Sequence, residues 1–294
     1  MKEKELTQLV PIYRESATET IQRDGVKIIN MKKVNYAKTA VIAVILTSLN
    51  FSICNAAPAV REYYELRIYH ISGKAQEERV DAYLKDAYIP ALHRAGIAKV
   101  GVFKPVEADT SFGKLVYVLI PFRVEGQYFH LDDILASDKV YTAASGNFTA
   151  AVYNDPPYQR VESILMKSFS DMPEAFSPKF STATGERIYE LRAYESATEE
   201  KALKKMEMFN QGGEIKLFKK LDFNLVFVGE VLAGTIRPDL MYMTSFSDTT
   251  SNRLHWKSFV DSPEWKTLSA MQEYKNTVSK IHRYFLHPAP YSEY

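Results

Sequence analysis

Two short stretches of this chain place a carboxylate, a guanidinium and a phenol on alternate residues. The first, Tyr64–Tyr69, reads YELRIY, and the second, Tyr189–Tyr194, reads YELRAY. Alternate residues of a strand lie on one face, so each stretch predicts a polar face able to hold a small polar or aromatic ligand. The candidate ligand-binding residues are Glu65, Arg67, Tyr69, Glu190, Arg192 and Tyr194.

These polar faces also have a purely structural interpretation. Buried charges are costly unless they are paired or hydrated. If the strands close into a barrel, we expect the polar faces to line a wet interior of ligand size, with Leu66 and Ile68 packed under helices. Alternatively, the Glu and Arg side chains pair with each other and hold the strands in register.

Two histidines, His130 and His255, occupy matching positions at the starts of predicted helices. A histidine beside a cavity can act as a general base, which makes these two the catalytic candidates. The alternative is that they cap a turn or pack at a rim. The sequence has no paired His, Glu or Cys spacing typical of a metal site and no glycine-rich phosphate loop, so we expect neither a metal nor a cofactor.

The repeated phrase belongs to a longer duplication. The same shift in register, without a gap, also pairs Leu115 with Leu240, Tyr117 with Tyr242, His130 with His255, Ser137 with Ser262 and Thr142 with Thr267. A run of matches in one register predicts two related units of about a hundred residues each. We expect the first repeat at 60–170, a Ser-, Pro- and Thr-rich linker at 171–185, and the second repeat at 186–294.

Each repeat is expected to fold in the order β-α-β-β-α-β. In the first, alternation and turn residues predict strands near 61–71, 99–106, 114–122 and 159–169, with helices near 74–95 and 127–150. The second repeat follows the same order, and Ser262-Pro263 predicts a helix start. The predicted fold class is α+β, with two ferredoxin-like βαββαβ repeats forming an intramolecular dimeric α+β barrel.

Several motifs of the second repeat resemble the NIPSNAP family. They are the opening YELRxY, Gly213-Glu214-Ile215, Phe227-Val228-Gly229-Glu230, Pro238–Met243, Arg253-x-x-Trp256-x-x-Phe259 and Ser262–Trp265. The resemblance spans roughly 61–294 and is strongest in the second repeat. The first repeat has Leu131 and Val140 where the second has Trp256 and Trp265. The resemblance implies a dimeric α+β barrel and no particular reaction.

Three functions remain open from the sequence. The first is a protein of unassigned activity that holds a small polar or aromatic ligand between its two sheets. The second is a cofactor-independent oxygenase or isomerase, in which Arg67 or Arg192 stabilises an enolate and His255 or a Glu moves a proton. The third is a protein-interaction scaffold, which needs an exposed apolar patch. Trp256 and Trp265 are expected to pack on the core or to form a pocket wall.

The composition and net charge limit the kinds of molecule that the protein is expected to bind. The net charge is +1 with 25% charged residues, so no basic field indicates nucleic-acid binding. A small-molecule ligand is the expected partner, and the oligomeric state is open.

Residues 1–59 have the character of an N-terminal extension followed by a signal peptide at 31–59. A basic stretch from Met31 to Lys38 precedes an apolar run to about Ile53 and small residues that include the single cysteine, Cys54. This order is typical of secretory signals. We therefore expect an exported protein, periplasmic or secreted, with no stable membrane span after cleavage. N-terminal sequencing should give a mature start between Ala57 and Val60; intact cytoplasmic protein would contradict this expectation.

Overall fold

The computed structural model describes residues 60–234 and 236–294, whose strands join into one closed antiparallel barrel. Around the barrel the order is β1-β3-β2-β8-β5-β7-β6-β4. The predicted signal peptide lies outside the described residues. The strands are β1 (Tyr63–His70), β2 (Gly101–Pro105), β3 (Leu115–Phe122), β4 (Arg160–Ser168), β5 (Ile188–Glu195), β6 (Asn224–Ala233), β7 (Asp239–Phe246) and β8 (Lys280–Pro288).

The two halves of the chain meet through the edges of their sheets. β2 pairs with β8, through Phe103–Pro105 against Leu286–Pro288, and β4 pairs with β6. The α+β class and the barrel are confirmed, but the halves are not two separate ferredoxin-like sheets stacked face to face. Two separate sheets would leave the N–H and C=O groups of their edge strands without hydrogen-bond partners. Pairing between the edges of the two halves supplies these partners, so one closed barrel forms instead.

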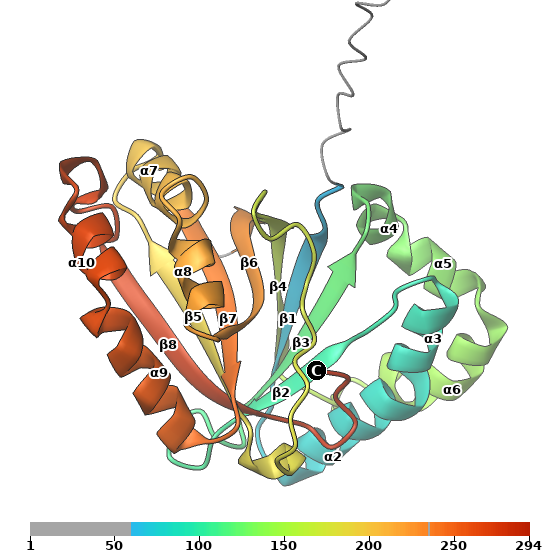
Figure 1. The fold of residues 1–294 in the computed structure, drawn as a ribbon. Coiled ribbons are helices and arrows are strands. Elements are labelled where there is room, and N and C mark those ends of the chain that lie inside the picture. Colours follow the sequence, from blue (N-terminus) through green and yellow to red (C-terminus); the bar gives the residue numbers. More distant parts are fainter. Residues whose placement is uncertain (1–59, 235) are drawn as a thin grey trace, which may run out of the picture. The chain divides into compact units, whose positions relative to one another are not determined.

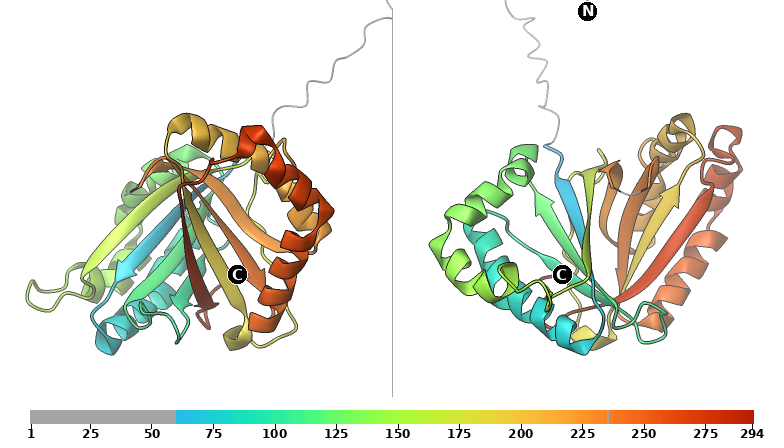
Figure 2. Two further views of the ribbon diagram at one scale, coloured as in Figure 1. Left: turned by 90° about the vertical axis from the view of Figure 1, so that its left-hand side faces the viewer. Right: turned by 180° about the vertical axis from the view of Figure 1, so that it is seen from behind.

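Helices cover the outside of each half (Figures 1 and 2). The helices of the first half are α2 (Lys74–Tyr83), α3 (Ile89–Arg94), α4 (Glu125–Phe129), α5 (Leu131–Ser137) and α6 (Lys139–Thr149). Those of the second half are α7 (Glu199–Phe209), α8 (Glu214–Lys220), α9 (Thr249–Asp261) and α10 (Pro263–Ala270). Short irregular helices complete the list: a π-helix at Leu84–Tyr88 and 3-10 turns at Thr184–Glu186 and Gln272–Tyr274.

Local sequence signals explain where several helices start and stop. Ser262 accepts a hydrogen bond from the Trp265 backbone N–H at 3.2 Å, which confirms the predicted cap of α10. Gly213, with φ +90°, separates α7 from α8, a backbone conformation that favours glycine. The π-helix lies directly before Pro90, where an ordinary helical hydrogen bond is lost.

The barrel interior is apolar, which reverses the expected orientation of the strands. Tyr64, Leu66 and Ile68 of β1 pack inside with Leu191 of β5 and residues from both halves. Tyr69 packs outward against the helices of the first half, and Tyr194 does so in the second. The prediction that the Glu-x-Arg-x-Tyr faces line the interior is therefore wrong. An eight-stranded barrel is just wide enough for side chains to fill, and apolar ones fill most of this one.

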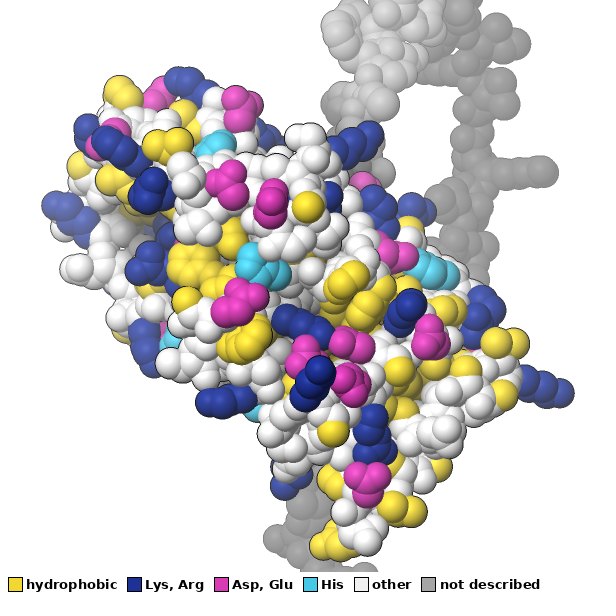
Figure 3. All heavy atoms as spheres, turned by 90° about the horizontal axis from the view of Figure 1, so that it is seen from below, with side chains coloured by type: hydrophobic (Ala, Val, Ile, Leu, Met, Phe, Trp, Pro, Cys, Tyr) yellow, Lys and Arg dark blue, Asp and Glu magenta, His cyan; other side chains and the backbone are white. Residues whose placement is uncertain are grey.

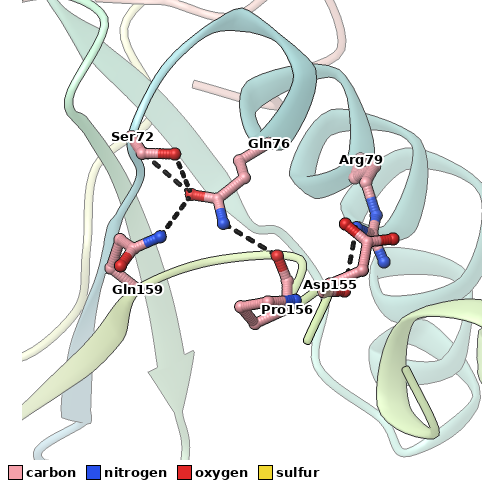
Figure 4. Close-up of polar contacts among 6 residues, drawn as sticks. All are labelled: Ser72, Gln76, Arg79, Asp155, Pro156 and Gln159. Atoms are coloured by element: carbon pink, nitrogen blue, oxygen red, sulfur yellow. Dashed lines mark hydrogen bonds and ion pairs between the residues drawn. The ribbon is translucent and has the colours of Figure 1, made fainter. Parts of the chain in front are cut away.

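A polar cluster ties α2 to the loop that leads into β4 (Figure 4). Gln76 accepts from the Ser72 backbone N–H at 2.8 Å and donates to the Pro156 carbonyl at 2.7 Å. Arg79 donates to the Asp155 carboxylate at 3.0 Å, and the Gln159 backbone N–H donates to the His70 carbonyl at 2.7 Å. These contacts hold the end of β1 against the start of β4.

The surface has a mixed character. On the face shown in Figure 3, basic and acidic side chains are interspersed with hydrophobic ones. Within residues 60–234 and 236–294, no helix is long and apolar enough to cross a membrane. In the same part of the chain, no group of His, Cys, Asp and Glu is arranged to hold a metal ion.

Candidate functional site

A groove of about 490 Å³ opens on the outer face of the second half. β5 and β8 form its floor, and α9 and α10 form its wall. Volumes of this size are typical of small-molecule sites. Its lining combines charged and aromatic groups: Glu190, Arg192, Tyr194, Glu214, Asn252, Arg253, Trp256, Phe259, Val260, Trp265, Ile281, Arg283 and Phe285.

The floor of the groove places two arginines directly opposite each other. In the antiparallel pairing of β5 with β8, Arg192 faces Arg283. Like charges at directly opposed positions destabilise a sheet. The pairing of Tyr194 with Ile281 and of Glu190 with Phe285 puts one apolar residue beside each polar one. The groove floor therefore presents two guanidinium groups framed by apolar side chains.

Glu190 organises this floor from beneath. Its side chain is fully buried and accepts from Arg192 Nε at 2.7 Å through Oε1. Its other oxygen, Oε2, accepts from Asn252 Nδ2 at 2.7 Å and from Trp256 Nε1 at 2.5 Å. One carboxylate thus links strand β5 to helix α9 and satisfies donors that burial would otherwise leave unpaired.

The guanidinium group of Arg192 lies over an aromatic ring. Its guanidinium carbon lies 3.6 Å from the ring centroid of Trp256, a close cation–π arrangement. It also donates to Tyr194 Oη at 3.2 Å. Burial lowers the pKa of Arg192, but Tyr242, Tyr194 and Glu190 outweigh burial and raise it above its ordinary value. The group therefore stays charged and oriented.

A second buried ion pair supports the inner end of the groove. Lys205 of α7 donates to Glu214 of α8 at 2.8 Å, and their side chains are 5% and 2% exposed. Burial raises the pKa of Glu214, opposed by Lys205 and Arg192. The Lys205 ammonium also lies 4.7 Å from the Phe209 ring centroid. Each buried charge in this layer thus has a partner of opposite sign.

The remaining charges give the groove a positive balance. Glu190 is paired with Arg192, and Glu214 is paired with Lys205. Arg253 and Arg283 are exposed and form no ion pair with any described residue. The unbalanced charge in the groove is therefore contributed by two guanidinium groups, which favour an anion.

The matching region of the first half is simpler. Glu65 accepts from Arg67 Nε at 3.0 Å and from Ser163 Oγ at 2.8 Å. Ser163 faces Arg67 across β1 and β4, where the second half has an arginine. Arg67 lies over the Tyr88 ring at 5.1 Å, and Tyr69 packs on Tyr158. The predicted residues of the first half thus form a separate cluster.

The two catalytic candidates do not join either cluster. His130 is exposed between α4 and α5. His255 lies on α9, where its Nδ1 is 2.8 Å from the Ser251 carbonyl, and its ring packs on Phe223 and Phe246. It is not among the residues that line the groove. The structure therefore brings together Glu190, Arg192 and Tyr194 but places no predicted histidine with them.

Four polar groove residues were not among the predicted site residues: Glu214, Asn252, Arg253 and Arg283. The sequence did contain a signal for Arg283. In the last predicted strand, Ile281, Arg283 and Phe285 are every second residue, so a charged side chain shares one face with two apolar ones. The first-half counterpart of Arg283 is a serine, so a search for residues shared by both repeats passes over it. Asn252 lies one helical turn before Trp256, on the same face of α9.

The chain was compared with known proteins both by sequence and by structure. A model of the NIPSNAP family matches residues 189–293. A proposed monooxygenase from Lactobacillus acidophilus NCFM is similar at 11% identity and a TM-score of 0.51, over 78% of this chain and 94% of that chain. An uncharacterised NIPSNAP-like domain protein from Burkholderia xenovorans matches at 16% identity and a TM-score of 0.32, over 37% of this chain and 90% of its own. No curated protein matches.

Proposed function

We propose that residues 189–293, which a model of the NIPSNAP family matches, bind a small planar anion, such as an aromatic carboxylate, in the groove over β5 and β8. The opposed pair Arg192 and Arg283 carries the proposal. A bound carboxylate would balance the charge of Arg283 and accept hydrogen bonds from both guanidinium groups. Guanidinium groups match the planar geometry of a carboxylate.

The walls of the groove support an aromatic body for this ligand. Phe259 and Phe285 are among the lining residues, with Val260 and Ile281 beside them. Val260 is 54% exposed and Ile281 is 51% exposed, so apolar surface is available where a ring would pack. The proposal moves the ligand from between the sheets, where it was expected, to the layer between sheet and helices.

The alternative of a cofactor-independent oxygenase or isomerase uses the same arginines differently. They would stabilise an enolate, but proton abstraction also needs a free base within reach. Among the described groove residues, both carboxylates are engaged in ion pairs. Ligand binding is therefore the function that this arrangement supports best. Oxygen uptake on mixing with an enolisable aromatic ketone would favour the enzyme instead.

A matched pair of variants tests the proposed binding. Arg283→Ser gives the second half the residue that the first half has at Ser163, and it changes an exposed side chain. We expect isothermal titration to show benzoate binding to the wild type and a loss of about tenfold or more in Arg283→Ser, equivalent to about 1.4 kcal/mol. Arg67→Ala, in the other half, should bind benzoate like the wild type.

Benzamide provides the chemical control because it has the same ring without the charge. Its binding should be much weaker than that of benzoate. Equal affinity of the wild type and Arg283→Ser for benzoate, or a loss in Arg67→Ala alone, would contradict the proposed site.

A further inference from the structure

A second cavity, of about 190 Å³, lies inside one end of the barrel. At this end β1 and β5 terminate and β4, β7 and β8 begin. Its walls are apolar and include Ile68, Ile164, Leu191, Ala193 and Met241. Its rim carries titratable groups, and none of them takes part in the groove.

Two histidine–carboxylate pairs face this cavity or its rim from opposite halves. His70 Nε2 of β1 is 2.5 Å from Glu162 Oε1 of β4. His282 Nε2 of β8 is 2.5 Å from Glu195 Oε1 of β5. The two halves place the histidine and the acid on opposite strands of the pair. In the first half the histidine is on β1 and the acid on β4, whereas in the second half the acid is on β5 and the histidine on β8. Each imidazole therefore already has a carboxylate partner.

Asp239 lines the same cavity without a complete set of partners. It is 8% exposed, and its Oδ1 forms no hydrogen bond with any described residue. Burial raises the pKa of Asp239 to about 6, with a further contribution from Glu195, while backbone N–H groups and His282 oppose the shift. A buried carboxylate oxygen without a donor is costly, so this group is open to a ligand that donates.

The charges around Asp239 favour a cation. The carboxylates that act on this end are Asp239, Glu162, Glu195 and Asp109, and the facing imidazoles are His70 and His282. Lys280 lies 3.8 Å from Glu195, and the phenols Tyr117 and Tyr284 complete the polar lining. These four carboxylates outnumber the two cations at this end, Lys280 and Arg160, the second of which stands opposite His70 in the sheet.

We infer that this end of the barrel binds a small primary alkylamine, with its ammonium on Asp239 and its alkyl chain along Ile68, Leu191 and Met241. The cavity equals the liquid volume of about six water molecules, which suits a compact chain of roughly six carbons. The site is separate from the groove and does not depend on the groove's ligand. The polar cluster of Figure 4 holds the neighbouring ends of β1 and β4, which form one side of this rim.

Calorimetric titration with hexylamine and hexanol tests this inference. At pH 8 we expect saturable binding of hexylamine, with hexanol at least about tenfold weaker because it lacks the charge. Binding should weaken as the pH falls through about 6, since Asp239 then takes up a proton. Asp239→Asn should lose the preference for the amine. Asp132→Asn, on exposed α5, should retain it.

A second variant keeps the test decisive if Asp239→Asn does not fold. Ala193→Leu fills the cavity while leaving every rim charge in place, and it should abolish hexylamine binding. Arg283→Ser should leave that binding unchanged. The inference is overturned if hexylamine does not bind, if hexanol binds equally well, or if Asp239→Asn or Ala193→Leu binds the amine like the wild type.

Discussion

Replacing Glu190 with alanine is expected to lower the free energy of unfolding by about 3–5 kcal/mol. The substitution leaves Arg192, Asn252 and Trp256 without their common acceptor in a buried layer. The matched change in the first half, Glu65→Ala, should cost less, about 1–3 kcal/mol, because its partner Arg67 is 20% exposed and can reach water. Urea denaturation of both variants at pH 7 measures the difference.

A third variant separates the loss of charge from the loss of hydrogen bonds at this position. Glu190→Gln keeps the size of the side chain and one acceptor oxygen, so its stability should lie between those of wild type and Glu190→Ala. Equal destabilisation by Glu65→Ala and Glu190→Ala would contradict this account. It would show that the additional buried partners of Glu190 do not contribute to the free energy of unfolding.

The buried pair of Lys205 and Glu214 should show strong coupling in a double-mutant cycle. Lys205→Met alone leaves the Glu214 carboxylate buried without its partner, and we expect a loss of about 3–5 kcal/mol. Adding Glu214→Leu removes that uncompensated charge and fills the space with apolar atoms. The double variant should therefore recover to within about 1 kcal/mol of the wild type or exceed it, as replaced buried ion pairs often do.

Thermal or urea unfolding of the four proteins gives the coupling energy directly. Losses that simply add, with the double variant the least stable, would mean that the pair is not desolvated as the side-chain exposures of 5% and 2% indicate. The groove's benzoate affinity provides a parallel readout, because Glu214 lines the groove.

The sequence predicted the elements of this fold better than their orientation. Duplication and period-two alternation located the eight strands, and Ser262 located the start of α10. Alternation also divided β1 correctly into two faces. It could not say which face is inside, because helices cover the outer face and both faces are buried. Charged residues beneath the helices then have the same pattern as charged residues inside a wet barrel.

The sequence named groove residues where the repeats agree and passed over those where the repeats differ. Glu190 and Arg192 were found because the first half has the same residues at Glu65 and Arg67. Arg283 was not, because its counterpart is Ser163. The rim of the barrel cavity was hidden for a related reason: His70 and Glu195 occupy matching positions but differ in type, so a search for identical residues does not connect them.

The central claim is that the second half alone carries an anion-binding groove, and tryptophan fluorescence tests it most directly. The chain has two tryptophans, Trp256 and Trp265, and both line this groove. Titrating the unmodified protein with benzoate should change its tryptophan emission in a saturable way, and benzamide should do so only at much higher concentration. Emission that does not respond to benzoate, or that responds equally to both compounds, would contradict the claim.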